Sequence, residues 1–242
     1  MNIVNQKVEL LDYMGTDISV VNAARVSFHK QSAYELRAVS SDGDCPDGEE
    51  EFVGEKDRRL LAYLARHNHW SPFAHAFLSF RIKASIFVAR HLVKHQVGLA
   101  WNEVSRRYVD DEPEFYFPEV WRGKPVNAKQ GSSDEVLTMY HDTDTGLTLN
   151  INNEARYIVG QLLMMYKDFI KEGMAPEQAR MILPHNLMTE WIWSGSLVAF
   201  ARVCKLRLDS HAQAETREIA QMINDLIPED FKYSWEALLN DS

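Results

Sequence analysis

Hydrophobic residues recur at two different spacings along the chain. From Ala76 to Lys83 every second residue is apolar, with Ala76, Leu78, Phe80 and Ile82 on one face. This alternation predicts a strand with one buried face. Further strands are predicted at 8–14, 108–117 and 187–193.

Other segments repeat their apolar residues at helical spacing and predict helices. These are residues 18–28, 56–67, 84–95, 149–171, 176–181, 197–206 and 212–226. Asp17 is the predicted N-cap of the first helix, because a short polar side chain there accepts from the free N–H groups of the first turn. Strands and helices mix without a regular βαβ rhythm, and no repeat or long linker divides the chain. The sequence therefore predicts one mixed α/β (α+β) domain over residues 1–242.

Residues 39–55 interrupt this pattern with a cluster of Ser, Gly, Asp and Glu, and we expect an acidic surface loop there. Between Asp42 and Asp57 lie eight acidic residues and one lysine, a net charge of −7. A compensating basic segment follows. Between Arg81 and Arg107 lie six basic residues and one acid, a net charge of +5.

The composition is that of an ordinary globular protein, with 242 residues, 45% hydrophobic and 25% charged. The formal net charge of −9 argues against a general nucleic-acid binder, which has a basic binding face. Two cysteines, Cys45 and Cys204, are too few for a disulfide framework. No secretory signal and no apolar run long enough to span a bilayer is apparent, so a cytoplasmic protein is expected.

The basic segment concentrates hydrogen-bonding side chains at a predicted helix end and loop. Between His91 and Tyr108 these are Lys94, His95, Gln96, Asn102, Glu103, Ser105, Arg106 and Arg107. Arg and Lys beside a hydroxyl and exposed backbone amides suit a phosphate, and a buried carboxylate at Glu103 would orient a sugar hydroxyl or an arginine. The segment is too small for duplex DNA, so a phosphorylated small molecule is the expected ligand.

A second polar group lies at 206–213. Asp209 or Ser210 is expected to cap the following helix. Arg207 and His211 have no such structural explanation, and their spacing leaves packing and function equally open. Arg180 stands among apolar neighbours and is expected to pair with a buried acid.

The histidines do not form a recognisable metal motif. His91 and His95 are four residues apart, but Leu92 stands where a zinc protease has glutamate. His67, His69 and His75 have no cysteine or carboxylate at a ligand-like spacing, so no metal site is predicted.

Several segments together resemble the flavin-dependent thymidylate synthases. Lys94-His95-Gln96, eight residues and Ser105 resemble the signature of that family, which is Arg-His-Arg, seven residues and Ser. Six further blocks agree in order, namely 23–28, 69–75, 86–90, 102–105, 179–184 and 206–213. The departures fall on the signature itself, where Lys94 replaces a bidentate arginine and Gln96 adds no charge.

This resemblance implies a homotetramer of mixed α/β subunits, each with a mainly antiparallel sheet packed by helices, and active sites where subunits meet. It implies FAD as cofactor, with NADPH, methylenetetrahydrofolate and dUMP as small-molecule substrates. The positions implied to bind dUMP are His91, Lys94, Glu103, Ser105, Arg106, Arg107, Arg180 and Arg207. Those implied to contact or approach the flavin are His69, Ser71, Lys94, His95, Gln96, Glu103, Ser196, Arg202 and His211. Arg207 is the implied catalytic residue, because it contacts the uracil ring.

The residue types agree with this chemistry. Methylation at C5 of uracil needs electron density on that carbon, which an activated cysteine supplies by adding at C6. Cys45 lies among acids and Cys204 among apolar helix neighbours, so neither is expected to be a nucleophile. A fixed cation such as Arg207 stabilises the developing charge instead. Two alternatives remain open, a metal-dependent nucleotide hydrolase and a nucleotide-binding protein without catalysis.

Overall fold

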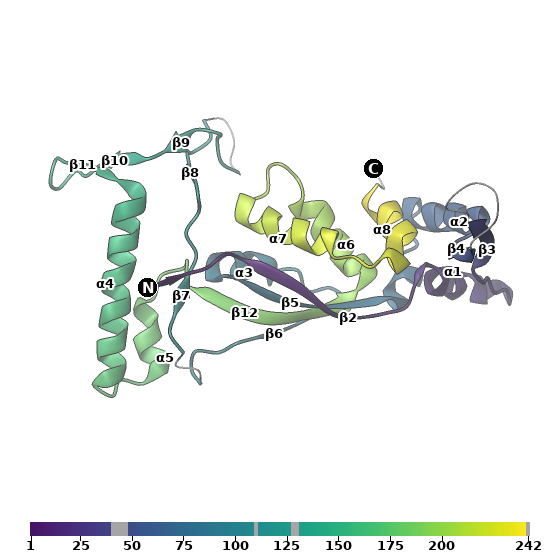
Figure 1. Cartoon of the computed structure of the whole chain (residues 1–242), viewed down its shortest axis with the longest axis horizontal. Helices are drawn as coiled ribbons and strands as arrows, with labels where there is room; N and C mark the ends of the chain where they lie inside the picture. Colours follow the sequence, from purple (N-terminus) through teal and green to yellow (C-terminus); the bar gives the residue numbers. More distant parts are fainter. Residues whose placement is uncertain (40–47, 109–110, 127–130, 241–242) are drawn as a thin grey trace.

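The computed structural model describes residues 1–39, 48–108, 111–126 and 131–240. At its centre is a four-stranded antiparallel sheet in the order β2-β5-β12-β6 (Figure 1). The strands are β2 (Lys7–Met14), β5 (Phe77–Ser85), β12 (Met188–Ser196) and β6 (Leu99–Glu103). The mainly antiparallel sheet packed by helices is therefore confirmed.

Three helices lie along one face of this sheet, and the remaining helices extend the molecule at its two ends (Figure 1). The covering helices are α3 (Ile86–Leu92), α6 (Leu197–Arg207) and α7 (Ala214–Asp225). One end holds α1 (Asp17–Arg25), α2 (Glu55–Arg66) and α8 (Lys232–Leu239), and the other holds α4 (Ile151–Lys171) and α5 (Pro176–Ala179). None of the helices in the described ranges is both long and apolar enough to cross a membrane.

The shorter strands form two-stranded pairs outside the central sheet. The two-stranded pairs are β1 (Asn2–Ile3) with β7 (Glu114–Phe115), β3 (Glu35–Val39) with β4 (Gly48–Phe52), β8 (Trp121–Arg122) with β9 (Val136–Leu137), and β10 (Met139–His141) with β11 (Thr148–Asn150). Four 3₁₀ turns complete the described elements, η1 (Val26–Phe28), η2 (Pro72–His75), η3 (Arg180–Ile182) and η4 (Glu229–Phe231).

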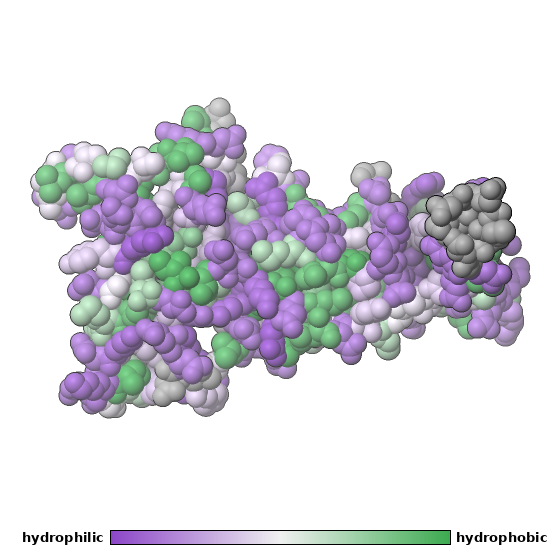
Figure 2. Space-filling view, viewed as in Figure 1, coloured by the Kyte–Doolittle hydropathy of each residue, from purple (hydrophilic) through white to green (hydrophobic). Residues whose placement is uncertain are grey.

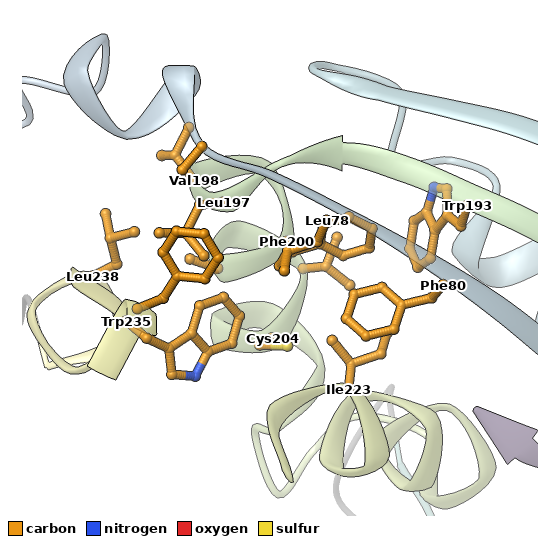
Figure 3. Close-up of a cluster of buried hydrophobic side chains, with 14 of the residues drawn as sticks. Leu78, Phe80, Trp193, Leu197, Val198, Phe200, Cys204, Ile223, Trp235 and Leu238 are labelled. Carbon is orange, nitrogen blue, oxygen red and sulfur yellow. The ribbon is translucent and has the colours of Figure 1, made fainter. Parts of the chain in front are cut away.

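The alternation predicted for β5 is confirmed, because Leu78, Phe80 and Ile82 are buried between the sheet and its helices. Phe200 of α6 meets Phe80 edge-to-face at 5.0 Å and Trp193 of β12 at 5.3 Å (Figure 3). Such pairs each stabilise by about 0.5–1.5 kcal/mol beyond their burial. They fix the orientation of α6, and α6 carries Arg207 at its last turn.

The N-cap of the first helix lies one residue before the predicted one. Thr16, not Asp17, is the N-cap, and it forms a reciprocal capping box with Ser19. Asp17 is almost fully buried and accepts hydrogen bonds from the backbone N–H groups of Tyr233 and Ser234, at 2.9 and 2.8 Å. It caps α8 rather than α1, a role that only the tertiary fold creates.

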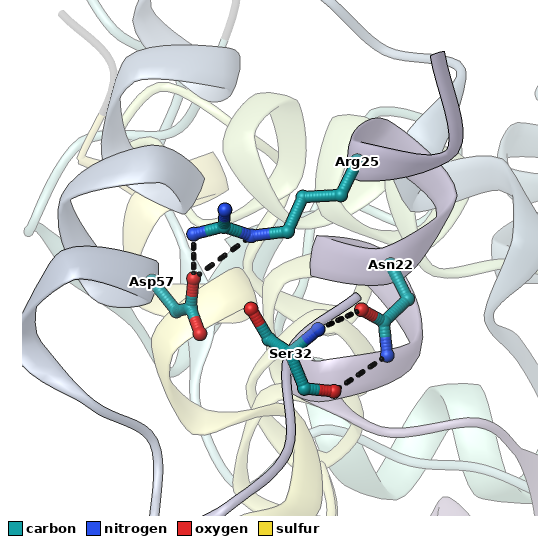
Figure 4. Close-up of polar contacts among 4 residues, drawn as sticks. All are labelled: Asn22, Arg25, Ser32 and Asp57. Atoms are coloured by element: carbon teal, nitrogen blue, oxygen red, sulfur yellow. Dashed lines mark hydrogen bonds and ion pairs between the residues drawn. The ribbon is translucent and has the colours of Figure 1, made fainter. Parts of the chain in front are cut away.

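A buried ion pair joins α1 to α2 (Figure 4). Arg25 donates from Nε to Oδ1 of Asp57 at 3.1 Å, and both side chains are largely buried. Beside it, Asn22 holds the chain that leaves α1, because its amide exchanges two hydrogen bonds with the backbone of Ser32. These contacts position α2, which leads directly to His69 and Ser71.

Three further sequence predictions need correction. Residues 48–52 form β4 rather than loop, because they pair along their length with β3; residues 40–47 of the predicted acidic loop lie outside the described residues. The strand predicted at 108–117 is reduced to β7, since its acidic centre and Pro113 do not support a ladder. Helix α8 was not predicted, because its apolar pattern is short.

Candidate functional site

Arg207 and His95 meet at the centre of the helical face. Arg207 ends α6, and His95 lies in the turn that follows α3. The guanidinium donates from Nε to Nε2 of His95 at 3.0 Å. Burial, then the charges of Arg207 and His91, lower the pKa of His95 to about 4. His95 is therefore a neutral acceptor that orients Arg207.

His91 stands one turn before His95 and also faces Arg207. Its Nδ1 lies 3.1 Å from the hydroxyl of Thr216 on α7. Burial and the charge of Arg207 lower the pKa of His91, so this ring too is neutral near pH 7. Two neutral histidines and one arginine are thus collected from α3, α6 and the turn between α3 and β6.

His91 and Arg207 border a cavity of about 450 Å³, and His95 contacts Arg207 without lining it. Its lining includes His91, Lys205, Arg207, Asp209 and His211. Asp209 does not cap α7 as predicted, because that helix begins after Gln213. Instead its Oδ1 accepts from the backbone N–H of His211 at 2.7 Å and lies 2.9 Å from Nδ1 of the same residue, and these bonds lower the pKa of Asp209. The cavity suits a small anionic ligand with a hydrogen-bonding edge.

The second half of the signature lies at the far end of a strand. The sequence predicted only a helix end and loop over 91–108, but residues 99–103 form β6 and pair with β12. A five-residue strand spans roughly 16 Å. The strand therefore separates the turn at 94–96 from Ser105 within one chain.

Glu103 ends this strand in an exposed position, which corrects the expectation of a buried carboxylate. It accepts hydrogen bonds from Thr189 Oγ1 at 2.7 Å and from Trp101 Nε1 at 3.2 Å. Both contacts orient the carboxylate, and neither neutralises it.

Beyond Glu103, the two arginines of the signature contact residues close to them in sequence. Arg107 donates from Nε to Ser105 Oγ at 3.2 Å, and Arg106 donates to the carbonyl of Asp111 at 2.9 Å. These contacts do not reach the cavity of Arg207. Arg180 lies exposed in η3 and donates to the carbonyl of Glu177 at 3.4 Å. Within the described residues it has no ion pair with a buried acid, which corrects the predicted pairing.

The residues implied to hold the flavin form two groups, one around the Gly98 turn and the start of α6, and one beyond the end of α2. Ser196 is the N-cap residue of α6, and Arg202 lies within that helix, where it donates to the carbonyl of Val97 at 3.4 Å. Gly98 lies against both, with φ of +78°, and a Cβ there would stand 3.1 Å from Ala199 Cβ and 3.2 Å from Ser196 Oγ. A Cβ at position 98 would therefore crowd the N-terminus of α6, and the positive φ also favours glycine there.

Lys94 and Gln96 are exposed on the same turn. His69 and Ser71 lie beyond α2 and are also exposed; the ring of His69 stacks on Tyr63 with 6.1 Å between centroids. Hydroxyls, an amide and cations around a glycine turn and a helix N-terminus form a donor set that fits the pyrophosphate of a dinucleotide such as FAD.

Other features do not reach this site. Cys204 is fully buried, its thiol donates to the carbonyl of Ala220, and burial raises its pKa to about 12; Cys45 lies outside the described residues. Within the described chain, no three His, Cys, Asp or Glu side chains lie close enough to hold a metal. The largest cavity described, about 780 Å³, lies between α4 and residues 116–122 and contains none of the predicted site residues.

Thr216 and Gly98 were missed by the sequence reasoning. Thr216 lies within an amphipathic helix pattern, and nothing local distinguishes it. Gly98 lies inside the signature spacer. A single glycine between apolar residues can indicate a close approach of the backbone, and this was the signal that the sequence contained.

Fold and site together define an α/β protein that binds small anionic ligands. A family model described as "Thymidylate synthase complementing protein" matches residues 9–231. The chain belongs to this family.

Individual proteins agree with that membership. The chain is 33% identical over 232 residues to a flavin-dependent thymidylate synthase of Thermotoga neapolitana, covering 96% of this chain and 90% of the relative. It is 34% identical over 230 residues to one of Thermus thermophilus, covering 95% and 74%. Among solved structures, a UMP/dUMP methylase PolB from Streptomyces cacaoi bound with 5-Br dUMP aligns with a TM-score of 0.75 at 27% identity, covering 98% and 96%.

Proposed function

We propose that this protein is an FAD-dependent thymidylate synthase that reductively methylates dUMP to dTMP, with methylenetetrahydrofolate as carbon donor and NADPH as reductant. The observation that supports it best is the Arg207–His95 hydrogen bond at the cavity of Arg207, within a chain of this family. The site collects a fixed cation and neutral donors and acceptors, which is what an anionic pyrimidine nucleotide requires.

Arg207 acts on the pyrimidine in this proposal. Burial lowers the pKa of Arg207, but a guanidinium remains charged at neutral pH. His95 accepts from Nε and leaves the terminal nitrogens to face the uracil. A cation held in this way stabilises negative charge that develops on the ring without reorganising during the reaction.

The remaining groups bind and orient. Glu103, Ser105, Arg106, Arg107 and Arg180 offer one carboxylate, one hydroxyl and three cations for the sugar and phosphate of dUMP. Lys94, Gln96, Ser196 and Arg202 would hold FAD around the Gly98 turn, with His69 and Ser71 beside it. The flavin, when bound, supplies the hydride chemistry.

A thiolate mechanism is not part of the proposal. Cys204 would have to ionise, and burial raises its pKa to about 12. It also lies on the face of α6 that packs against α7, among the core side chains (Figure 3). Electrostatic activation by Arg207 needs no nucleophile from this chain.

We propose that the protein acts as a homotetramer in the cytoplasm. The two halves of the signature are separated by β6, so a partner subunit is needed to bring a Ser105 segment to an Arg207 cavity. The segment from β8 to β11 also exposes apolar residues, including Val126 at 94%, Val136 and Leu147 (Figure 2). An exposed apolar surface of this kind suits contact with another subunit.

Purified protein tests the proposal directly. It is expected to be yellow or to take up FAD, to oxidise NADPH faster when dUMP is present, and to form dTMP from dUMP and methylenetetrahydrofolate. Light scattering is expected to give four copies of the 27.9 kDa chain. Protein that binds dUMP but not FAD would favour the non-catalytic alternative, and stoichiometric zinc, iron or manganese would favour the hydrolase.

A further inference from the structure

The buried hydroxyl of Thr216 sits behind His91. Thr216 lies in the first turn of α7 with no exposed surface, and its Oγ1 is 3.1 Å from Nδ1 of His91 on α3. His91 in turn lines the cavity that Arg207 borders. Thr216 therefore touches the wall of the cavity from outside, without lining it.

The direction of this hydrogen bond follows from what each group has available. A neutral imidazole has one N–H and one acceptor nitrogen. His91 is neutral, because burial and the charge of Arg207 lower its pKa. For the Thr216 hydroxyl, Nδ1 of His91 is the one hydrogen-bond partner in the part of the chain that is described. A buried hydroxyl that fails to donate costs free energy, so Thr216 donates and Nδ1 accepts.

The proton of His91 is then on Nε2, the nitrogen left for a ligand. His95 shows the opposite arrangement, because its Nε2 accepts from Arg207 and its proton is therefore on Nδ1. The two rings beside Arg207 are thus set in opposite tautomers by different neighbours. A ring nitrogen that carries a lone pair would repel the oxygens of a phosphate or carbonyl, whereas an N–H donates to them.

We propose that Thr216 is a positioning residue that holds His91 in the Nε2–H tautomer, so that His91 donates a hydrogen bond to an oxygen of the bound nucleotide. The identity of that nucleotide as dUMP rests on the proposed function; the tautomer does not.

The tautomer is measurable in the wild-type holoenzyme without any substitution. Two-dimensional ¹H–¹⁵N spectra of the histidine rings distinguish protonated from unprotonated nitrogens, and His91→Gln assigns the signals. We expect a protonated Nε2 and an unprotonated Nδ1 at pH 7.5. A protonated Nδ1 would overturn the proposal.

Three variants then test the consequence for binding. Thr216→Val keeps the shape and removes the hydroxyl, Thr216→Ser keeps the hydroxyl, and Ile219→Val removes one buried methyl group from the same helix. We expect Thr216→Val to mix the tautomers and weaken dUMP binding about five-fold, the effect of one hydrogen bond. The Ser and Ile219 variants are expected to stay within about two-fold of wild type.

If Thr216→Ser weakens dUMP binding as much as Thr216→Val does, or if Thr216→Val leaves dUMP binding unchanged, the hydroxyl has no role. If Thr216→Val does not fold, the wild-type spectrum and the Ser variant decide. Wild-type protein with the expected tautomer but no affinity for dUMP would refute the proposed function and leave the tautomer assignment standing.

Discussion

Arg207 and His95 are 112 residues apart in sequence, and their side chains are joined by a hydrogen bond of 3.0 Å from Nε to Nε2. The bond requires a neutral His95, and the burial that keeps the ring neutral also strengthens the interaction. One relationship thus fixes both the orientation of the guanidinium and the protonation state of the ring.

Replacing Arg207 with alanine is expected to abolish dTMP formation while FAD stays bound. In the proposed mechanism the cation acts on the pyrimidine, whereas the Gly98 turn holds the flavin. Loss of one preorganised charge lowers turnover by roughly 100- to 1,000-fold. Single-turnover dTMP formation and flavin absorbance measure the two effects.

The matched control is Arg59→Ala, which removes an exposed arginine on α2 and is expected to change neither dTMP formation nor FAD binding. Near-normal turnover in Arg207→Ala would show that another group activates the ring.

The stability of the protein is expected to fall as the pH drops from about 6.5 towards 4, partly through His95. The folded-state pKa of His95 is about 4 against an ordinary 6.5, so in this window the unfolded chain binds the proton more tightly. The stabilisation is complete above pH 6.5 and is lost as the pH falls. After allowance for solvent screening of a half-buried ring, it is about 1–2 kcal/mol.

Urea unfolding at pH 7.5 and 5.0 measures this contribution. His95→Gln is expected to flatten the pH dependence relative to wild type, whereas His141→Gln, on exposed β10, is expected to leave it unchanged. If the unfolding free energy changes with pH equally in wild type and His95→Gln, His95 is not the source of this contribution.

Gly98→Ala is expected to weaken FAD binding by at least ten-fold. The added Cβ would stand 3.1 Å from Ala199 and 3.2 Å from Ser196, on backbone with φ of +78°. Gly146→Ala is the matched control, since Gly146 has a similar φ of +71° but nothing within 4 Å. Backbone strain alone costs about 1 kcal/mol in both, so only the close approach separates them. Titration with FAD measures the difference, and equal affinities for the two variants would count against flavin at this turn.

Cys204→Ala is expected to retain dTMP formation. The thiol is fully buried and burial raises its pKa to about 12, so no thiolate forms at neutral pH. The substitution should reduce the free energy of unfolding by about 1 kcal/mol through a small cavity. Initial rates and urea unfolding test both statements. A folded, yellow variant without turnover would restore a nucleophilic role.

Much of the fold was predictable from the chain. The two-residue alternation at 76–82 identified β5, because a strand between a sheet face and helices buries every second side chain. The helix at 149–171 was recognisable from its apolar residues at helical spacing. The signature blocks identified the family, since residue type and order can be read from the sequence without the geometry.

The strand β6 was not predictable from the signature. None of the residues Leu99–Glu103 is fully buried, and the strand is held by pairing with β12 and by Trp101, which stacks on Trp191 at 4.2 Å and meets Trp193 edge-to-face at 5.5 Å. Before that packing exists, Trp101, Asn102 and Glu103 have the composition of a loop. Pairing with β12 supplies the free energy that stabilises these residues as a strand. The strand then separates Ser105 from the turn at 94–96.

By itself, the sequence determined the periodicities, the charge distribution and the family, because each depends only on residue type and spacing. The tertiary structure decided which side chains share a cavity and in what state. Thr216 reaches His91, and Asp17 caps α8, only after chain segments more than 100 residues apart have packed together. Protonation follows burial, and burial exists only in the folded chain, so the neutral rings of His91 and His95 beside Arg207 belong to the structure alone.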